Sequence, residues 1–181
     1  MQNNPHIQEQ DLRELHQDAV QWAMYCVGYE ADLGREVVQQ AYLKVVEGSA
    51  RFEGRSTLKT WLFGVIRLTA LECRRKHRLH AVAAADYMEP DMLVAPADTR
   101  EEFSEQYSAA AVAQALAALS RMQREIMYLA FYRELTLSEI ADILGVSIGT
   151  IRTQYHRAKQ KMSRLLLAGE SDGKTAEAIH Q

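Results

Sequence analysis

The segment TLSEIADILGVS, residues 136–147, decides the fold of the C-terminal half of the chain. Thr136 is followed three residues later by Glu139, which is the spacing of a capping box at the start of a helix. Gly145 suits the left-handed residue that ends such a helix, and Ser147 can cap a second helix directly after the turn. A short apolar helix, a glycine-containing turn and a capped second helix are typical of a helix-turn-helix motif. We therefore predict this motif within residues 136–168.

The second helix of the motif separates its apolar residues from its basic residues. The window 146–168 contains five Lys or Arg residues and no acidic residue, and its apolar residues recur at spacings of three and four. Short polar side chains near the start of the helix can reach base edges in the major groove of DNA, and the basic side chains further along can contact phosphates. A solvated helix face in a bundle is the alternative interpretation. The candidate DNA contacts are Ser147, Thr150, Arg152, Thr153, Gln154, Arg157 and Lys161.

Apolar periodicity predicts more helices upstream, so the expected fold class is all-α. The spacing indicates helices over about 11–28, 33–48, 58–79, 103–119 and 121–132. Residues 81–102 interrupt this pattern with two of the three prolines and several acidic residues, which is typical of a linker. We expect two small helical domains, 1–80 and 103–168, joined by the acidic linker 81–102 and followed by a disordered tail, 169–181.

Basic residues gather in a second region of the chain. The formal net charge is −3, but residues 51–80 carry a net charge of +6 and residues 81–120 a net charge of −6. In the helix expected over 58–79, the spacing of Arg67, Arg74 and Arg78 predicts one basic stripe. Phe52 and Trp61 lie close to it in sequence, and aromatic rings beside basic side chains can hold unpaired nucleic-acid bases. Compensation of the helix dipole and packing of Trp61 in the core are the alternatives.

Composition argues against several other classes of protein. No stretch approaches the ~18 apolar residues that a membrane-spanning helix needs, and the polar N-terminus is unlike a secretory signal peptide. Cys26 and Cys73 form no CxxC pair, which argues against a disulfide framework or a zinc site. The histidines form no HExxH pattern and no glycine-rich phosphate loop is present, so an enzyme is a weaker alternative. We expect a cytoplasmic protein without a cofactor and without membrane insertion.

Two stretches together resemble a known family. Residues 51–78, RFEGRSTLKTWLFGVIRLTALECRRKHR, are similar to the promoter-melting and minus-ten segment of the small bacterial sigma factors of the extracytoplasmic-function type. Residues 119–166 are similar to the minus-thirty-five domain of the same family. The resemblance spans about residues 12–168, and it is specific because both stretches occur in this order with an acidic segment between them. It implies a promoter-specificity subunit of RNA polymerase.

The resemblance also implies three sets of contact residues. The helix-turn-helix residues named above would bind the minus-thirty-five element. The expected minus-ten contacts are Phe52, Arg55, Lys59, Trp61, Arg67, Leu68, Leu71, Arg74, Arg75 and Arg78. The expected contacts with the polymerase clamp are Glu36, Gln39, Gln40, Leu43 and Lys44. The implied partners are core RNA polymerase, through its clamp and flap regions, promoter DNA and an anti-sigma factor.

The chain departs from the family pattern at three places. The clamp-docking segment, residues 35–40, reads REVVQQ, so acidic residues usual in the family are missing. Leu68 stands where the family usually has an asparagine that helps to read the melted strand. Gln154 replaces a frequent arginine of the recognition helix. These departures predict altered contacts with the polymerase and with both promoter elements.

A stand-alone helix-turn-helix regulator is the alternative function. Such a protein would explain residues 119–166, but it would leave residues 35–78 without a role. It would also bind two half-sites as a dimer, whereas a sigma factor binds asymmetric elements as a single copy.

Overall fold

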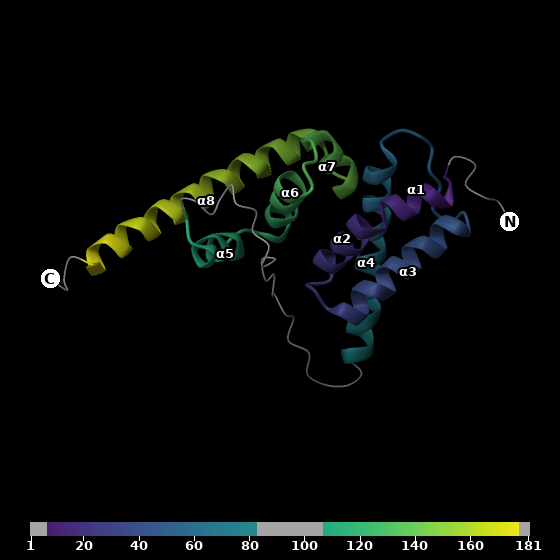
Figure 1. Cartoon of the computed structure of the whole chain (residues 1–181), viewed down its shortest axis with the longest axis horizontal. Coiled ribbons are helices and arrows are strands. Elements are labelled where there is room, and N and C mark those ends of the chain that lie inside the picture. Colours follow the sequence, from purple (N-terminus) through teal and green to yellow (C-terminus); the bar gives the residue numbers. More distant parts are fainter. Residues whose placement is uncertain (1–6, 83–106, 178–181) are drawn as a thin grey trace. The chain divides into compact units, whose positions relative to one another are not determined.

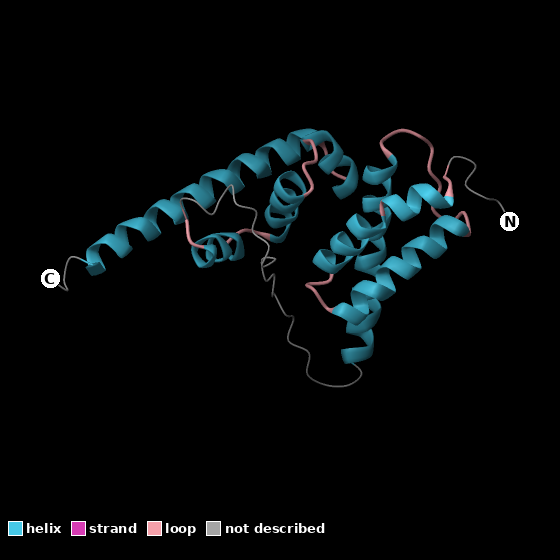
Figure 2. Cartoon of the chain, in the orientation of Figure 1, coloured by secondary structure: helices cyan, strands magenta, loops and turns pink. Residues whose placement is uncertain are grey.

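The computed structural model describes residues 7–82 and 107–177, and all regular elements in these two ranges are helices (Figures 1 and 2). This confirms the predicted all-α fold class. The chain divides into two compact units. The first contains helices α1 to α4, and the second contains α5, α6, α8 and the first residues of α7. Most of the predicted linker, residues 83–102, lies outside the described residues.

The first unit is built on three helices that pack against one another. Its elements are α1 (Glu9–Glu14), α2 (His16–Cys26), α3 (Ala31–Val46) and α4 (Leu58–Val82), and α2, α3 and α4 are in mutual contact. Trp22 occupies the centre of the core and is fully buried, as are Leu62, Phe63 and Ile66 on α4. The Trp22 ring stacks on Phe63 at 5.7 Å, and its Nε1 donates a hydrogen bond to the Phe63 carbonyl at 3.0 Å. The buried indole N–H is therefore satisfied.

Gly34 allows α2 and α3 to pack closely. It lies in α3 and is buried, and a Cβ atom at this position would overlap the sulfur of Met24 on α2. A larger residue would therefore push the two helices apart.

The main difference from the predicted helices of this unit is a break at Leu15. In addition, α3 begins and ends about two residues earlier than expected, and α4 ends three residues later. The helix expected over 11–28 is two helices, because Leu15 adopts φ −86° and ψ −4° and its N–H bonds to the Asp11 carbonyl as α1 ends. A capping box between Gln8 and Asp11 starts α1 separately. The predicted start of α4 is confirmed, because the Thr60 N–H donates to the Thr57 hydroxyl oxygen at 3.1 Å and so caps the helix.

The second unit packs α5 (Ala109–Ala117) and α6 (Arg121–Tyr132) against the long helix α8 (Ile148–Glu177). The short helix α7 (Leu137–Leu144) precedes α8. In Figure 1, α8 runs on past α5 toward the C-terminus. The core cluster comprises Val112, Ala115, Leu119, Met127, Ala158, Met162 and Leu166. Residues 103–106 of the helix expected over 103–119 lie outside the described residues, and α5 covers the rest only from Ala109.

In the structure α8 continues through residues 169–177, where the sequence analysis expects a disordered tail. The physical reason is that a helix anchored by packing has already met the cost of nucleation, so further turns add one backbone hydrogen bond per residue. These residues contain no proline that would stop this extension. Residues 178–181 lie outside the described residues.

Candidate nucleic-acid interface

The turn between α7 and α8 has the geometry that the sequence predicts. The Glu139 N–H donates to the Thr136 hydroxyl oxygen at 3.3 Å, and the Thr136 N–H donates to the Glu139 carboxylate at 2.9 Å. Gly145 has φ +67°, and the Thr150 N–H donates to the Ser147 hydroxyl oxygen at 3.1 Å. The capping box, the left-handed glycine and the second cap are therefore confirmed. Together they fix the N-terminal end of α8.

Arg152 and Arg157 are exposed on α8, whereas Ile151 on its other side is fully buried. Arg152 lies one turn from the capped start of α8, and Arg157 lies more than one turn further along. The hydroxyl groups of Ser147 and Thr150 bond to each other at 2.9 Å, and Thr153 donates to the Gly149 carbonyl at 2.9 Å. Among the predicted contacts, the two arginines therefore carry the long cationic side chains directed to solvent.

Gln154 has an internal partner. Its side-chain oxygen accepts a hydrogen bond from Gln123 Nε2 of α6 at 3.1 Å. Gln123 also closes the capping box at the start of α6, since its side-chain oxygen accepts from the Ser120 N–H at 3.1 Å. Gln154 therefore ties the recognition helix to the first turn of α6.

Lys161 also points into its own unit. Its ammonium group donates to the Ala118 carbonyl at the end of α5. Arg124, which is buried, donates from Nη1 to the Ala117 and Leu119 carbonyls at 3.0 and 2.9 Å. Two cations therefore satisfy carbonyl groups left over at the C-terminus of α5, where positive charge is favourable. The structure gives Lys161 this packing role in addition to any phosphate contact.

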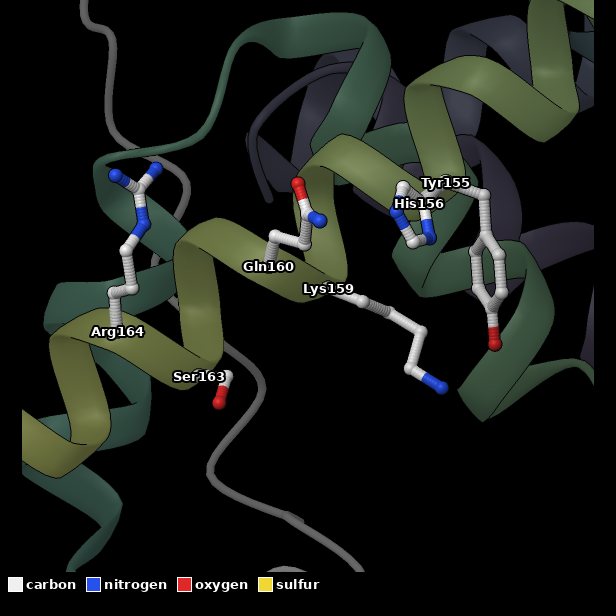
Figure 3. Close-up of a pocket in the computed structure, with 6 residues that line it drawn as sticks. All are labelled: Tyr155, His156, Lys159, Gln160, Ser163 and Arg164. Carbon is white, nitrogen blue, oxygen red and sulfur yellow. The ribbon is translucent and has the colours of Figure 1, made fainter.

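A shallow hollow lies further along α8 (Figure 3). Its lining side chains all come from this helix and contain no acidic group: Tyr155, His156, Lys159, Gln160, Ser163 and Arg164. The Lys159 ammonium lies 5.6 Å from the centre of the Tyr155 ring, so the aromatic face holds this cation. The basic surface therefore continues beyond the predicted contacts. None of the six lining residues is among those contacts, although Lys159 and Arg164 belong to the acid-free basic window that the sequence shows.

The first unit carries an aromatic pair beside α4. Phe52, in the loop before the helix, and Trp61, in its first turn, lie with ring centres 5.4 Å apart and planes tilted by 53°. Both side chains are half-buried. Trp22 and Phe63 fill the centre of the core, so the Phe52–Trp61 pair lies at its border and is partly open to solvent. An aromatic surface of this kind can stack on an unpaired base.

Several basic side chains predicted for the same surface bond inside the unit instead. Lys59 forms an ion pair with Asp18 at 2.7 Å and links α4 to α2. Arg74 is half-buried, and its Nη1 donates to the Cys26 carbonyl at the end of α2 at 3.3 Å. Arg55 pairs with Glu53 within the exposed loop at 2.7 Å. The stripe that the spacing predicts is therefore divided, because one side of α4 faces α2.

The remaining side chains of this set lie on the outer part of α4. Arg75 and Arg78 are exposed, and Arg67 and Leu71 are half-buried. Leu68 has 59% of its surface exposed.

The predicted clamp contacts on α3 fall into two groups. Gln39, Gln40 and Leu43 are exposed, opposite the buried valines of the core face. Lys44 instead bonds to Glu72 of α4 at 2.7 Å, and Glu36 lies 3.2 Å from His77 of the same helix. Val46, 60% exposed, extends the outer face and was missed by the sequence analysis. Its neighbour Val45 is buried in the core instead.

The described part of the chain also bears on three other features: reactive thiols, metal-ligand clusters and membrane-spanning helices. Cys26 and Cys73 are buried free thiols, and burial raises the pKa of the Cys73 thiol, with the Glu36 carboxylate adding to this effect. No cluster of three or more potential metal ligands occurs among the described residues. Within the same ranges, no helix is both long enough and apolar enough to span a bilayer.

Two family models match the chain in the order that this geometry suggests. The Sigma-70 region 2 model matches residues 12–80, and the Sigma-70 region 4 model matches residues 115–164. A relative named ECF RNA polymerase sigma factor EcfG, from Rhodopseudomonas palustris, is 29% identical over 136 residues, which cover 75% of this chain and 72% of that protein. The chain belongs to the extracytoplasmic-function sigma factors.

Other comparisons agree with this family. The RNA polymerase sigma factor YlaC of Bacillus subtilis is 22% identical to this sigma factor over 152 residues, covering 84% of this chain and 87% of that protein. Among solved structures, the sigma factor RpoE from Bartonella quintana, crystallised with the anti-sigma factor NepR, has 26% identity and a TM-score of 0.65. That match covers 87% of this chain and 95% of the other.

Membership of this family identifies the chain as a factor that directs promoter-specific transcription initiation. The stand-alone regulator is not favoured, because region 2 accounts for residues that this alternative leaves without a role. Sigma factors are initiation factors rather than enzymes, which agrees with the expectation of a non-enzyme.

Proposed function

We propose that this sigma factor uses three separate surfaces in initiation: the outer face of α3 for the polymerase clamp, the Phe52–Trp61 pair with outer α4 for melted minus-ten DNA, and the start of α8 for the minus-thirty-five element. The observation that carries the proposal is the pair of exposed arginines on α8, Arg152 and Arg157. They follow a turn in which side-chain caps fix the starts of both α7 and α8. A helix N-terminus held in this way can enter the major groove with its side chains already positioned.

For the polymerase, the supporting feature is the outer face of α3. Gln39, Gln40, Leu43 and Val46 are exposed there, although the helix is anchored by its valine-rich inner face. A mixed polar and apolar face on a rigid helix suits docking to another protein. Glu36 and Lys44 then act by fixing α3 against α4.

For melted DNA, the supporting features are aromatic rings and exposed cationic side chains in one unit. Phe52 and Trp61 can stack on unpaired bases, while exposed Arg75 and Arg78 can contact phosphates. A base leaving the duplex costs a few kcal/mol, which such stacking can offset.

We further propose that the domains are residues 1–80 and 103–168, with residues 81–102 as the linker, and that the protein acts in the cytoplasm. The similar RpoE structure was solved with an anti-sigma factor, and this supports an anti-sigma factor as a third partner of this chain, besides core polymerase and promoter DNA.

The test is reconstitution with core RNA polymerase. The full chain is mixed with core enzyme, and the holoenzyme selects bound sequences from a pool of randomised duplexes, followed by transcription from the selected DNA. We expect one copy of the chain per polymerase and selected DNA with two different elements. Palindromic DNA bound by the chain as a dimer, with no association with core polymerase, would contradict the proposal.

A further inference from the structure

We propose that Leu68 makes the outer face of α4 select a thymine in the melted minus-ten strand by contact with the thymine C5-methyl group. This inference rests on the proposed placement of melted DNA on α4. Leu68 therefore acts as a specificity-determining residue, and its ligand is the one apolar group that a base edge presents.

Core packing does not account for leucine at position 68. Its side chain is 59% exposed, whereas Leu62 and Ile66 on the same helix are fully buried. Leu68 is the only large apolar residue of α4 that is exposed among the described side chains. A polar residue would be accommodated at such a position without loss of packing. The leucine is therefore available for a contact outside this unit.

The surroundings of Leu68 suit a single nucleic-acid strand. Helical spacing of three and four places five residues along one side of α4: Trp61, Val65, Leu68, Glu72 and Arg75. Trp61 contacts Phe52 at one end, and exposed Arg75 lies at the other. The Glu72 carboxylate would repel a phosphate, but its ion pair with Lys44 at 2.7 Å compensates that charge. Aromatic, apolar and cationic groups thus follow one another along the helix.

The chemistry of the leucine side chain sets which base it can select. Leucine can neither donate nor accept a hydrogen bond, so it cannot distinguish bases by the polar atoms of their edges. Thymine alone carries a methyl group, and burial of one such group is worth about fourfold in affinity. We expect this modest preference at one position of the minus-ten strand, the position that lies over Leu68.

The experiment removes the methyl group and nothing else. Holoenzyme reconstituted from the full chain and core polymerase is titrated with a premelted promoter in which each non-template thymidine is replaced in turn by deoxyuridine. We expect binding about fourfold weaker at one position and unchanged at the others. Holoenzyme with Leu68→Ala, or with the nearly isosteric Leu68→Asn, should bind the thymidine and deoxyuridine promoters equally well at that position.

Leu167 provides the matched control. It is an exposed leucine on α8, with 55% of its surface accessible, and lies in the other unit. Leu167→Ala should keep the wild-type ratio between thymidine and deoxyuridine templates. Circular dichroism of the three variants checks that each one folds.

The outcomes separate this inference from the proposed function. If wild-type holoenzyme binds the premelted promoter but discriminates at no position, methyl selection is wrong and strand capture stands. If Leu68→Ala weakens all templates equally with the ratio preserved, Leu68 is a wedge without base preference, and the inference is again overturned. If wild-type holoenzyme does not bind premelted DNA, the proposed function of α4 fails, and the inference fails with it.

Discussion

The ammonium group of Lys44 on α3 lies 2.7 Å from the Glu72 carboxylate on α4, and it also donates to the Thr69 hydroxyl at 3.1 Å. Thr69 is buried, so the lysine satisfies a polar group that water does not reach freely. The pair spans the two helices that carry the proposed polymerase and minus-ten surfaces. Changes at Lys44 should therefore affect stability as well as docking.

Lys44→Met should lower the free energy of unfolding of the first unit by about 1 kcal/mol, because it leaves Glu72 and Thr69 without this partner. Glu72→Gln should have a similar effect, and the double variant should lose less than the sum of the two. Both tryptophans of the chain lie in this unit, so their fluorescence during urea unfolding reports on it alone. Strict additivity would show that the pair is not coupled.

Gln40→Arg combined with Leu43→Ala should weaken the affinity for core polymerase by about tenfold while leaving unfolding unchanged, since both side chains are exposed on α3. The affinity is measured by fluorescence anisotropy of labelled protein titrated with core enzyme. Gln17→Arg, an exposed change of the same kind on α2, is the matched control. Unchanged affinity of the double variant would place the docking surface elsewhere.

Arg152→Ala should cost ~1–3 kcal/mol on the preferred minus-thirty-five sequence and relax discrimination at one base pair, because Arg152 lies near the N-terminal end of α8. Arg157→Ala should weaken all sequences alike and reduce the salt slope of binding by about one. Holoenzyme binding to randomised minus-thirty-five duplexes at several salt concentrations distinguishes these effects. The reverse pattern would mean that the helix is rotated in the groove relative to our proposal.

Arg124→Met should destabilise α5 by about 3 kcal/mol, since it leaves the Ala117 and Leu119 carbonyls without their charged donor. Amide hydrogen exchange of α5 measures this loss locally. Arg164→Met, at an exposed position of α8, should leave the exchange unchanged. Equal protection in both variants would mean that Arg124 does not hold the end of α5.

Cys73 should react slowly with a thiol reagent in the native state, because burial, together with the Glu36 carboxylate, raises the pKa of its thiol. A raised pKa means that the folded state keeps a proton which the unfolded state releases, so stability should fall as the pH rises above roughly 9. The unfolding of Cys26→Ala is measured from pH 7 to 10. The double variant Cys26→Ala/Cys73→Ala is the comparison. If its stability fell more steeply with pH than that of Cys26→Ala alone, this assignment would be contradicted.

The local signals of the sequence were sufficient wherever the partners are close neighbours in the chain. The capping box of Thr136 and Glu139, the left-handed Gly145 and the Ser147 cap all join residues within one turn, and the structure confirms each one. Capping depends on a few adjacent dihedral angles and side chains, so spacing alone predicts it. The start of α4 and the bounds of α6 were predicted from apolar spacing, which is also a local signal, and the structure confirms both.

Only the tertiary structure decided which polar side chains remain available for a partner. Lys44, Arg74 and Gln154 were all expected on binding surfaces, yet their bonds reach partners on other helices, 28, 48 and 31 residues away in sequence. Helical periodicity predicts which side of a helix a residue occupies, but not which neighbouring helix that side faces. Long side chains at the border of the core can turn either way, and the packing of α2 against α4, α3 against α4 and α6 against α8 determines the direction they take.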